Sequence, residues 1–427
     1  MSKPIVLIAE ELSPATVEAL GPDFDVRNVD GTDRSAFLAE LADAQAVLVR
    51  SATKIDGEAI AAAPKLKVVA RAGVGLDNVD IKSATTAGVM VVNAPTSNII
   101  SAAELTVGHI LSLARHIPAA HASLAQGLWK RSSFTGTELF EKTLGIIGLG
   151  RIGALITARL QAFGVKVIAF DPYVTSARAQ QLGVQLVTLD ELLAESDFVT
   201  IHMPKTPETT GMISTEQLRA MKPTAFVINV ARGGLIDEEA LLGALRTGEI
   251  AGAGLDVFTS EPPVADSVAH QLLSLPNVVV TPHLGASTEE AQEKAGVSVA
   301  RSVRLALDGE LVPDAVNVAG GVIDPYVRPG ISLVEKLGQI FASLAHSPLT
   351  SIDVEVHGEL SQYDVSVLKL AALKGIFTNI VSESVSYVNA PLLAEQRGIN
   401  VRLLTDDKSD EYRNVITTKG TATKWGG

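Results

Sequence analysis

The sequence predicts an α/β protein built around parallel β-sheets. Strand-like apolar runs alternate with amphipathic helix-like segments through about the first 283 of its 427 residues, which is typical of βα units. Hydrophobic residues make up 47% of the chain but aromatic residues only 4%. The core must therefore consist of Val, Ile, Leu and Ala, as in buried parallel sheets covered by helices. The length indicates about three domains.

Composition excludes some classes of partner and chemistry. The formal net charge of -13 argues against a nucleic acid or an anionic membrane as partner. The absence of cysteine excludes disulfides, thiolate metal sites and a cysteine nucleophile, and we expect no metal ion. The N-terminus runs directly into a strand-like segment, without a signal peptide or an apolar run of transmembrane length. We therefore expect a cytoplasmic protein.

The first domain is predicted from residue 4 to about residue 97, where strand and helix signals alternate. Amphipathic segments such as Ser13 to Leu20 and Arg34 to Leu41 separate the apolar runs. The expected strands are Pro4–Ala9, Phe24–Val29, Ala46–Val49, Leu66–Ala70 and Val89–Val92. This repetition predicts a mostly parallel, flavodoxin-like sheet whose ligands bind beyond the carboxyl ends of the strands.

Two of these strands end in arginine motifs. Arg50 and Ser51 follow one apolar run, and Arg71 follows another, just before Gly73 and Val74. The planar guanidinium group can bind two oxygens of a phosphate or carboxylate at once. A single arginine would be better explained as a solvated surface charge. Two at equivalent strand ends, each followed by small residues, favour an anion-binding site.

A long apolar helix is predicted from Ser101 to His116 and is expected to carry the chain into a second domain. A polar arm follows it at residues 125–134, in which Trp129 lies beside two cations, one of them Arg131. An exposed tryptophan in such a place favours contact with a partner subunit. A plain surface loop explains the same residues equally well.

A glycine-rich turn begins the second domain. Gly148, Gly150 and Gly153 follow a short apolar run, and a helix pattern comes directly after them at residues 154–163. The first glycine permits a tight turn, the second lets a pyrophosphate approach the backbone, and the third lets the helix pack against the sheet. The start of the helix offers free N–H groups to phosphates.

An acidic residue completes this pattern. The predicted strand at residues 165–170 is followed by Asp171, whose carboxylate can accept hydrogen bonds from a ribose diol and would repel a 2′-phosphate. The glycines alone could be a chance cluster, because the chain holds 35 glycines. With the strand, the helix and the acid in register, they predict a Rossmann-type domain that binds NAD rather than NADP.

Three further strand ends of this domain carry residues suited to hydride-transfer chemistry. The expected strands are Phe198–His202, Ala225–Val230, Gly252–Val257 and Val278–Thr281. Hydride transfer requires a base for the hydroxyl proton, a group that orients the base and a cation for a substrate carboxylate. His283, Glu261 and Arg232 follow successive strands and supply these roles in that order. His283 alone, one of eight histidines, would be better explained as a structural residue.

A second long helix is expected to return the chain to the first domain. It runs from a capping-box-like start at residues 287–290 to a stop at Asp308-Gly309. An NAD-binding domain of residues 99–287 would then be inserted in a substrate-binding domain of residues 1–98 and 288–318. The active site would lie in the cleft between them.

Residues 319–427 predict a separate C-terminal α+β domain. Helix-like segments cover Ser332–Ser347, Val365–Asn379 and Ala390–Glu395, and strands are expected at Ser351–His357 and Val401–Leu404. The last residues indicate a hairpin at Lys419-Gly420 whose second arm stops abruptly. Because an unfinished sheet edge is a liability, we expect this domain to be incomplete or to pair with another subunit.

These motifs together resemble those of the D-2-hydroxyacid dehydrogenases over about residues 4–318. The segments that carry the resemblance are Arg71–Asp80, Asn93–Asn98, Gly145–Gly153, Asn229–Gly234, Asp256–Pro262 and Thr281–Thr288. The resemblance implies an oxidoreductase that uses NAD. It is strongest to family members that oxidise 3-phospho-D-glycerate to 3-phosphooxypyruvate, the first step of serine biosynthesis.

The resemblance also implies roles for individual residues. Arg232, Glu261 and His283 would take the catalytic roles described above. The cofactor would be bound by Gly148, Gly150, Arg151, Ile152, Gly153 and Asp171, with Met203, Val230, Ala231, Asp256 and Gly285 towards its nicotinamide. The substrate would be bound by Arg50, Ser51, Arg71, Gly73, Val74, Asn98 and Arg131, with Arg50 and Arg71 on its phosphate and Arg131 reaching in from a neighbouring subunit.

Family members dimerise through the NAD-binding domain, so the resemblance implies a homodimer or a tetramer. The C-terminal part resembles the start of the regulatory or intervening domain of a long form, in which a serine-binding ACT domain follows. The chain ends before such a domain would begin.

Two alternative functions remain open from the sequence. One is another D-2-hydroxyacid dehydrogenase, such as a glyoxylate or hydroxypyruvate reductase. The other is an NAD-sensing binding protein similar to transcriptional corepressors of this fold, against which the acidic chain and the C-terminal domain argue.

Overall fold

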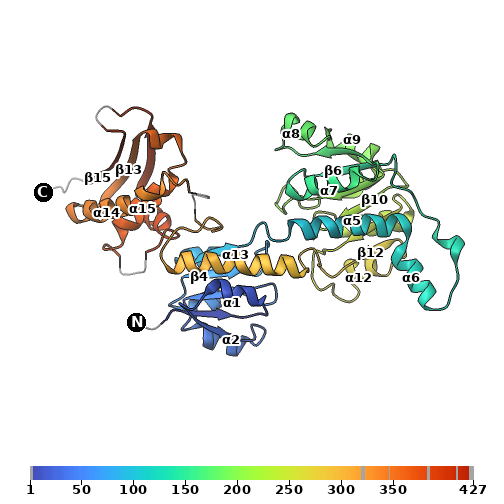
Figure 1. Ribbon diagram of the computed structural model, residues 1–427, viewed down its shortest axis with the longest axis horizontal. Helices are drawn as coiled ribbons and strands as arrows, with labels where there is room; N and C mark the ends of the chain where they lie inside the picture. The colour runs from blue at the N-terminus through green and yellow to red at the C-terminus, as the bar shows by residue number, and fades with distance from the viewer. Residues whose placement is uncertain (1–2, 319–322, 346, 382–384, 410–411, 423–427) are drawn as a thin grey trace. The chain divides into compact units, whose positions relative to one another are not determined.

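The computed structural model describes residues 3–318, 323–345, 347–381, 385–409 and 412–422 (Figure 1). These residues form two compact units, one of residues 98–291 and one of the residues before 98 and after 291. Each unit contains a parallel sheet connected by helices, which confirms the predicted α/β class. In the described ranges, no helix combines the length and the apolar character needed to span a bilayer.

The first unit contains a five-stranded parallel sheet with the strand order β2-β1-β3-β4-β5. Its strands are β1 (Ile5–Ile8), β2 (Asp25–Asn28), β3 (Ala46–Val49), β4 (Val68–Arg71) and β5 (Met90–Asn93). Val47 and Leu48 of β3 are fully buried in cores on opposite faces of the sheet. Covered faces explain why these strands are continuous apolar runs. The strand order reverses between β1 and β3, which is the flavodoxin-like arrangement.

Helices α1 (Pro14–Leu20), α2 (Arg34–Leu41), α3 (Gly57–Ala61) and α4 (Ile81–Thr86) connect these strands. The long helix α13 (Glu289–Leu307) adds Val299 to the core beside β1 and β3. It packs closely on α1, because a Cβ on Gly296 would lie 2.0 Å from Thr16 Oγ1. Asn317 then accepts the N–H of Val91 at 2.9 Å. The chain therefore returns to the first sheet after completing the second unit.

The second unit contains a seven-stranded parallel sheet with the order β12-β11-β10-β9-β6-β7-β8. Its strands are β6 (Thr143–Ile147), β7 (Lys166–Phe170), β8 (Gln185–Leu186), β9 (Phe198–Ile201), β10 (Phe226–Asn229), β11 (Gly252–Leu255) and β12 (Val278–Val280). The order reverses between β6 and β9, where open α/β sheets bind their ligands.

The second unit also contains helices, most of which pack on this sheet. They are α5 (Ile99–Arg115), α6 (Ile117–Ala125), α7 (Arg151–Gln161), α8 (Ser176–Gln181), α9 (Leu189–Glu195), α10 (Thr215–Ala220), α11 (Glu238–Thr247) and α12 (Val268–Leu273). Helix α5 approaches β11 closely at Gly254, where a Cβ would lie 3.1 Å from His109 Nδ1 and 3.2 Å from Leu113. A small residue in the strand thus sets the distance between helix and sheet.

The C-terminal part of the first unit contains a three-stranded sheet with the order β14-β13-β15. Its elements are α14 (Arg328–Leu344), β13 (Leu349–Gly358), the 3-10 helix η2 (Glu359–Gln362), α15 (Ser366–Phe377), α16 (Ala390–Gln396), β14 (Asn400–Asp406) and β15 (Asn414–Ala422). Helices α14 and α15 cross closely, because Gly338 faces the carbonyl of Ala372 and Gly375 faces that of Glu335. The alternate residues of β13 are buried against them, as the alternating sequence predicted.

The hairpin predicted at Lys419-Gly420 is wrong. Both residues lie inside β15, which runs antiparallel to β13, with Gly420 paired to Ile352. A side chain at Gly420 would not fit, because a Cβ would lie 2.4 Å from the ring of Phe341 on α14. Glycine often indicates a turn in a sequence, but Gly420 instead leaves room for the helix to pack against the sheet.

The polar arm is more structured than the sequence indicated. His116 ends α5 in the left-handed conformation, with φ 52°, and α6 begins directly after it with a proline in its first turn. The 3-10 helix η1 (Arg131–Phe134) lies farther along the arm. Neither element was predicted, because no residue of α6 or η1 is buried and the segment therefore lacks an amphipathic pattern.

Candidate active site

The glycine-rich turn joins β6 to α7 in the second unit. Gly148 has φ 96°, a conformation that favours glycine, and a Cβ on it would lie 2.5 Å from the carbonyl oxygen of His202. A Cβ on Gly153 would lie 2.4 Å from the carbonyl oxygen of Gly148. Gly150, at the N-cap of α7, faces open space instead. This arrangement fits a dinucleotide pyrophosphate that approaches the backbone at the start of the helix.

Asp171 directly follows β7 and fixes the turn. Its Oδ2 accepts the N–H of Leu149 at 2.8 Å, and its Oδ1 accepts the N–H of Tyr173 at 2.8 Å. Each carboxylate oxygen can accept more than one hydrogen bond. Asp171 can therefore hold the turn and also accept a ribose hydroxyl.

The other predicted cofactor residues lie along the same edge of the sheet. Arg151 and Ile152 form the start of α7, Met203 follows β9, and Val230 and Ala231 follow β10. Strands β6, β9 and β10 are neighbours in the sheet. Their carboxyl ends therefore bring these residues together next to the glycine-rich turn.

His283 and Glu261 form a hydrogen-bonded pair beyond the ends of β12 and β11. His283 Nδ1 lies 2.6 Å from Glu261 Oε2, and Glu261 Oε1 accepts the N–H of Phe258 at 2.9 Å. The bond to Glu261 raises the pKa of His283, against the opposing effect of burial. Burial alone would raise the pKa of Glu261, but the bonds from His283 and Phe258 lower it. The pair therefore stabilises a positive imidazolium.

Arg232 lies on the loop after β10, the strand next to β11. Its charge has a small lowering effect on the pKa of His283 and on that of Glu261, after the larger effects of hydrogen bonding and burial. The side chain of Asn229 donates to the carbonyl of Arg232 at 2.8 Å. A Cβ on Gly233 would lie 1.8 Å from the carbonyl oxygen of Phe258. The absence of a side chain at this glycine therefore lets the neighbouring loop approach.

The loop that carries His283 is held by Asp256. The N–H groups of Leu284 and Gly285 donate to its carboxylate at 2.7 and 2.9 Å, and Thr281 Oγ1 donates at 2.5 Å. His283 itself has φ 54°, which is uncommon for a residue other than glycine. Its N–H donates to the carbonyl of Asp256 at 2.9 Å. Asp256 and Gly285 therefore hold the loop of His283 in place, and their predicted contact with the cofactor stays a prediction.

His283 differs from two other histidines near this edge. Burial lowers the pKa of His109, whose Nε2 lies 2.9 Å from Thr281 Oγ1. Burial lowers the pKa of His202 to about 3, and its Nε2 lies 2.8 Å from Thr200 Oγ1. Both therefore stay neutral at physiological pH, whereas the environment of His283 favours its charged form.

The predicted arginine motifs lie at one edge of the five-stranded sheet in the first unit. Val49 is paired with Arg71 across β3 and β4, so Arg50 and Arg71 emerge at neighbouring strand ends. A Cβ on Gly73 would lie 1.8 Å from Arg71 Nη1, so this glycine makes room for the guanidinium group. The residues brought together here are Arg50, Ser51, Arg71, Gly73 and Val74.

The two remaining predicted substrate residues belong to the second unit. Asn98 is the N-cap residue of α5, where its side chain makes no capping hydrogen bond. Arg131 is exposed in η1 of the arm. Their roles toward a substrate stay predictions.

Sequence reasoning missed two polar residues of the first unit. Glu10 accepts backbone N–H groups of the segment after β3, and Asn78 donates to carbonyls of the same segment. Glu10 lies just beyond the end of β1, which is a position where the strand-end rule could have found it. Asn78 lies within the segment Arg71–Asp80 that carries part of the family resemblance, but the carbonyls to which it donates, those of Arg50 and Thr53, are distant in sequence.

Two family models match the chain. Residues 107–285 match the NAD binding domain of the D-isomer specific 2-hydroxyacid dehydrogenases. Residues 326–425 match the D-3-phosphoglycerate dehydrogenase intervening domain. The first match contains the glycine-rich turn, Asp171 and all three candidate catalytic residues, and it confirms NAD as the cofactor.

Curated relatives and a solved structure agree with these matches. The chain is 54% identical to D-3-phosphoglycerate dehydrogenase of Mycobacterium leprae, over 99% of this chain and 79% of the relative. It is 42% identical to the enzyme of that name from Rattus norvegicus, over 93% of this chain and 74% of the relative.

The solved structure is that of Aquifex aeolicus D-lactate dehydrogenase complexed with NAD and lactic acid. It superposes with a TM-score of 0.63 at 29% identity and covers 72% of this chain and 96% of that one. The site geometry, the family models and the relatives lead to one conclusion. The chain belongs to the D-3-phosphoglycerate dehydrogenases of the D-isomer specific 2-hydroxyacid dehydrogenase family.

Proposed function

We propose that the chain oxidises 3-phospho-D-glycerate to 3-phosphooxypyruvate, the first step of serine biosynthesis. The observation that supports this best is the His283–Glu261 pair, 2.6 Å apart, next to the loop of Arg232. All three residues follow adjacent strands of the sheet that also carries the dinucleotide turn. The substrate follows from what the relatives are named for and from two arginines at one strand edge.

His283 is the general base. Its Nδ1 is bonded to Glu261, so Nε2 is the ring nitrogen left to take the hydroxyl proton of the substrate. Taking the proton makes the ring positive, and the carboxylate of Glu261 stabilises that charge. In the reverse direction the same nitrogen returns the proton to the forming hydroxyl.

Arg232 binds the carboxylate of the substrate next to the reacting carbon. Its planar guanidinium group can hold two carboxylate oxygens and polarise the forming carbonyl. NAD, when bound at the glycine-rich turn, supplies the hydride acceptor. The turn, Asp171 and the start of α7 would hold it.

Arg50 and Arg71 bind the phosphate of the substrate. They end neighbouring parallel strands, where ligands of such sheets bind. A phosphate dianion is better matched by two arginines than by one. This site is what would separate the chain from family members that act on unphosphorylated acids, such as the D-lactate dehydrogenase above.

We also propose that the chain works in the cytoplasm as a homodimer formed through its NAD-binding unit, alone or within a tetramer. The arm of that unit presents Leu124, Leu128 and Trp129 to solvent, and Trp129 is 81% exposed. Apolar side chains of this size on one segment are typical of a protein interface. Arg131 lies on the same arm and would reach the substrate of the partner.

The domain boundaries follow from this assignment. Residues 1–98 and 288–318 form the substrate-binding domain, and residues 99–287 form the NAD-binding domain. Residues 319–427 form the regulatory or intervening domain, which is supported by the family match at residues 326–425.

The experiment that tests the function is NADH oxidation by the purified protein with 3-phosphooxypyruvate, beside hydroxypyruvate and glyoxylate. We expect kcat/KM for the phosphorylated acid to exceed that for either other acid by at least about 100-fold, since a bidentate pair of charged contacts is lost without the phosphate. Equal or greater activity with an unphosphorylated acid would contradict the proposed substrate.

A further inference from the structure

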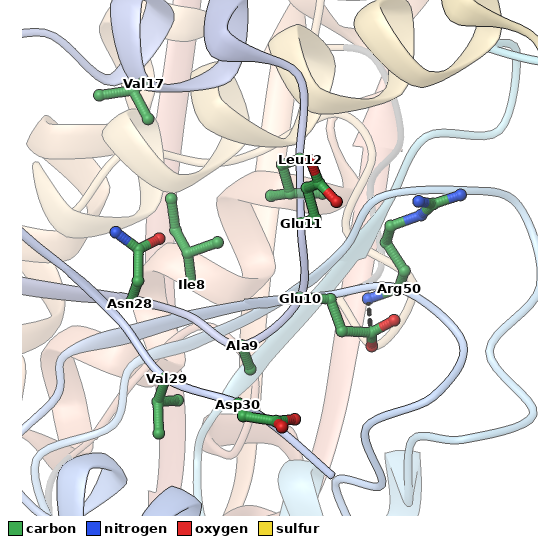
Figure 2. A pocket seen from close by; sticks show the side chains of 10 residues that line it. All are labelled: Ile8, Ala9, Glu10, Glu11, Leu12, Val17, Asn28, Val29, Asp30 and Arg50. Carbon is green, nitrogen blue, oxygen red and sulfur yellow. Dashed lines mark hydrogen bonds between the residues drawn. The ribbon is translucent and has the colours of Figure 1, made fainter.

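The carboxylate of Glu10 holds the segment from Arg50 to Thr53. Glu10 Oε1 accepts the N–H groups of Arg50 and Thr53 at 2.8 and 3.0 Å, and its Oε2 accepts that of Ala52 at 3.2 Å. Figure 2 shows the first of these bonds. Three backbone N–H groups that converge on one carboxylate form an anion-binding concavity, and such charge-assisted bonds are stronger than neutral ones. Glu10 is half-buried and Thr53 is fully buried, so these bonds are partly shielded from water.

Asn78 holds the same segment from its carbonyl side. Its Nδ2 donates to the carbonyl oxygens of Arg50 at 2.8 Å and Thr53 at 2.6 Å. Ile55 in turn donates its N–H to the carbonyl of Asn78 at 2.9 Å. Asn78 belongs to the chain that follows Arg71, so these bonds tie the two arginine-bearing loops together.

The guanidinium group of Arg50 is left available by this arrangement. In Figure 2 it extends away from the carboxylate of Glu10, which binds only the backbone of Arg50. Among the described residues, no hydrogen bond or ion pair of this guanidinium occurs. Glu10 and Arg50 both border a cavity of about 640 Å³ over the ends of β1, β2 and β3 (Figure 2). The strand order reverses here, where such sheets bind ligands.

We propose that Glu10 is a positioning residue for the substrate phosphate site. Its carboxylate fixes the backbone of residues 50–53, with the help of Asn78, so that the Arg50 side chain starts from one defined position. A negative charge is used to build a site for an anion. It can do so because backbone N–H groups, not the guanidinium, occupy its oxygens. This inference rests on the proposed role of Arg50 in binding phosphate.

Replacement of Glu10 tests this role through the split between KM and kcat. Glu10→Ala removes all three acceptors, and we expect the KM for 3-phosphooxypyruvate to rise about 10-fold or more, because small displacements of a binding group are costly. Glu10→Gln keeps one oxygen that can accept from Arg50 and Thr53, so its effect should be smaller. In both variants kcat and the KM for hydroxypyruvate should stay within about 2-fold of wild type, since neither depends on the phosphate site.

Glu18→Ala is the control. Glu18 lies on α1 of the same unit, is exposed and does not line the cavity, and it makes no hydrogen bond or ion pair within the described ranges. Its replacement should leave both KM values unchanged. Thermal unfolding of each variant shows whether it is folded at the assay temperature. If Glu10→Ala does not fold, Glu10→Gln and Asn78→Ala carry the test, because each removes only part of the hold on residues 50–53.

The outcomes separate this inference from the proposed function. An equal rise of KM for both acids, or no rise in any folded variant, would overturn the positioning role. Wild-type protein that shows no preference for the phosphorylated acid would instead overturn the proposed substrate. A wild-type preference that is undiminished in folded Glu10→Ala removes only the role of Glu10.

Discussion

The two units of the molecule present functional groups at strand ends in opposite ways. At the ends of β10, β11 and β12, the functional side chains act on one another: His283 bonds to Glu261, and Arg232 changes the pKa of both. At the ends of β3 and β4, Arg50 is positioned through its backbone by Glu10 and Asn78. Its guanidinium group takes no part in those bonds.

This difference follows from what each edge has to do. A base needs a tuned pKa, and only a neighbouring charge or hydrogen bond can tune it. An anion site needs a positive charge that no internal carboxylate has neutralised. Replacements in the NAD-binding unit should therefore change kcat and its pH dependence, and replacements at the arginine edge should change KM.

The largest effect is expected for His283→Ala. Loss of the general base should lower kcat by about 1,000-fold, within the range for removal of general acid–base catalysis. NADH binding, followed by fluorescence titration, should change little, because the glycine-rich turn and Asp171 are separate from His283. His270→Ala, at an exposed histidine on α12, is the control and should keep full activity. Retention of wild-type turnover by His283→Ala would remove the catalytic assignment.

Glu261→Gln sharpens the comparison through pH. It should lower kcat by about 10- to 100-fold, because the carboxylate no longer stabilises the imidazolium. The hydrogen bond to Glu261 raises the pKa of His283, so its loss lowers that pKa. Oxidation needs the unprotonated base, and the acidic limb of kcat/KM against pH should therefore move to lower pH.

The control for this pH shift is Glu238→Gln. Glu238 accepts the N–H of Thr259 at 2.6 Å and so holds the same loop without bonding to His283. It should leave the acidic limb in place. A limb that moves to higher pH in Glu261→Gln, or does not move, would contradict the role of Glu261 as the partner that raises the pKa of His283.

The placement of Arg232, Glu261 and His283 at one sheet edge could be predicted because it depends on local signals. Arg232, Glu261 and His283 each follow a recognisable apolar strand, and the carboxyl ends of parallel strands must meet at one edge of the sheet. Once β10, β11 and β12 are adjacent, the meeting of the three side chains needs no further information. The same rule found Arg50 and Arg71.

What the sequence did not predict depends on contacts between distant segments. Glu10 and Arg50 are forty residues apart, and no local sequence pattern predicts the hydrogen bond between the Glu10 carboxylate and the Arg50 backbone. The hairpin predicted at Lys419-Gly420 was wrong for the same reason. The glycine is required by packing against the ring of Phe341, which lies far away in the sequence, and not by a turn. That Asp256 lines the cofactor stays a prediction, and no local pattern indicated that its oxygens also hold the loop of His283. Local sequence patterns thus predict the helices, the strands and the sheet edge at which a residue lies. Tertiary packing decides which partner each polar group binds.

Arg50→Ala tests the arginine edge directly. It should raise the KM for 3-phosphooxypyruvate by about 10- to 100-fold, the loss expected for a charge-assisted contact, with kcat within about 2-fold. The KM for hydroxypyruvate should change far less, because that acid lacks the phosphate. Arg27→Ala is the control, since Arg27 lies on β2 of the same sheet and pairs with Asp25 at 2.9 Å. Equal changes for the two acids would remove Arg50 from the phosphate site.

Asp171→Ala is expected to have the smallest effect, on cofactor choice. Without the carboxylate, a 2′-phosphate is no longer repelled, so the ratio of kcat/KM for NADH to that for NADPH should fall by about 10-fold. Asp171 also accepts the N–H of Leu149, so Asp171→Asn, which can keep that bond, separates the loss of charge from loosening of the turn. A lower ratio in both variants would assign the selectivity to the charge. A lower ratio in Asp171→Ala alone would assign it to the turn, and an unchanged ratio in both would contradict the ribose contact.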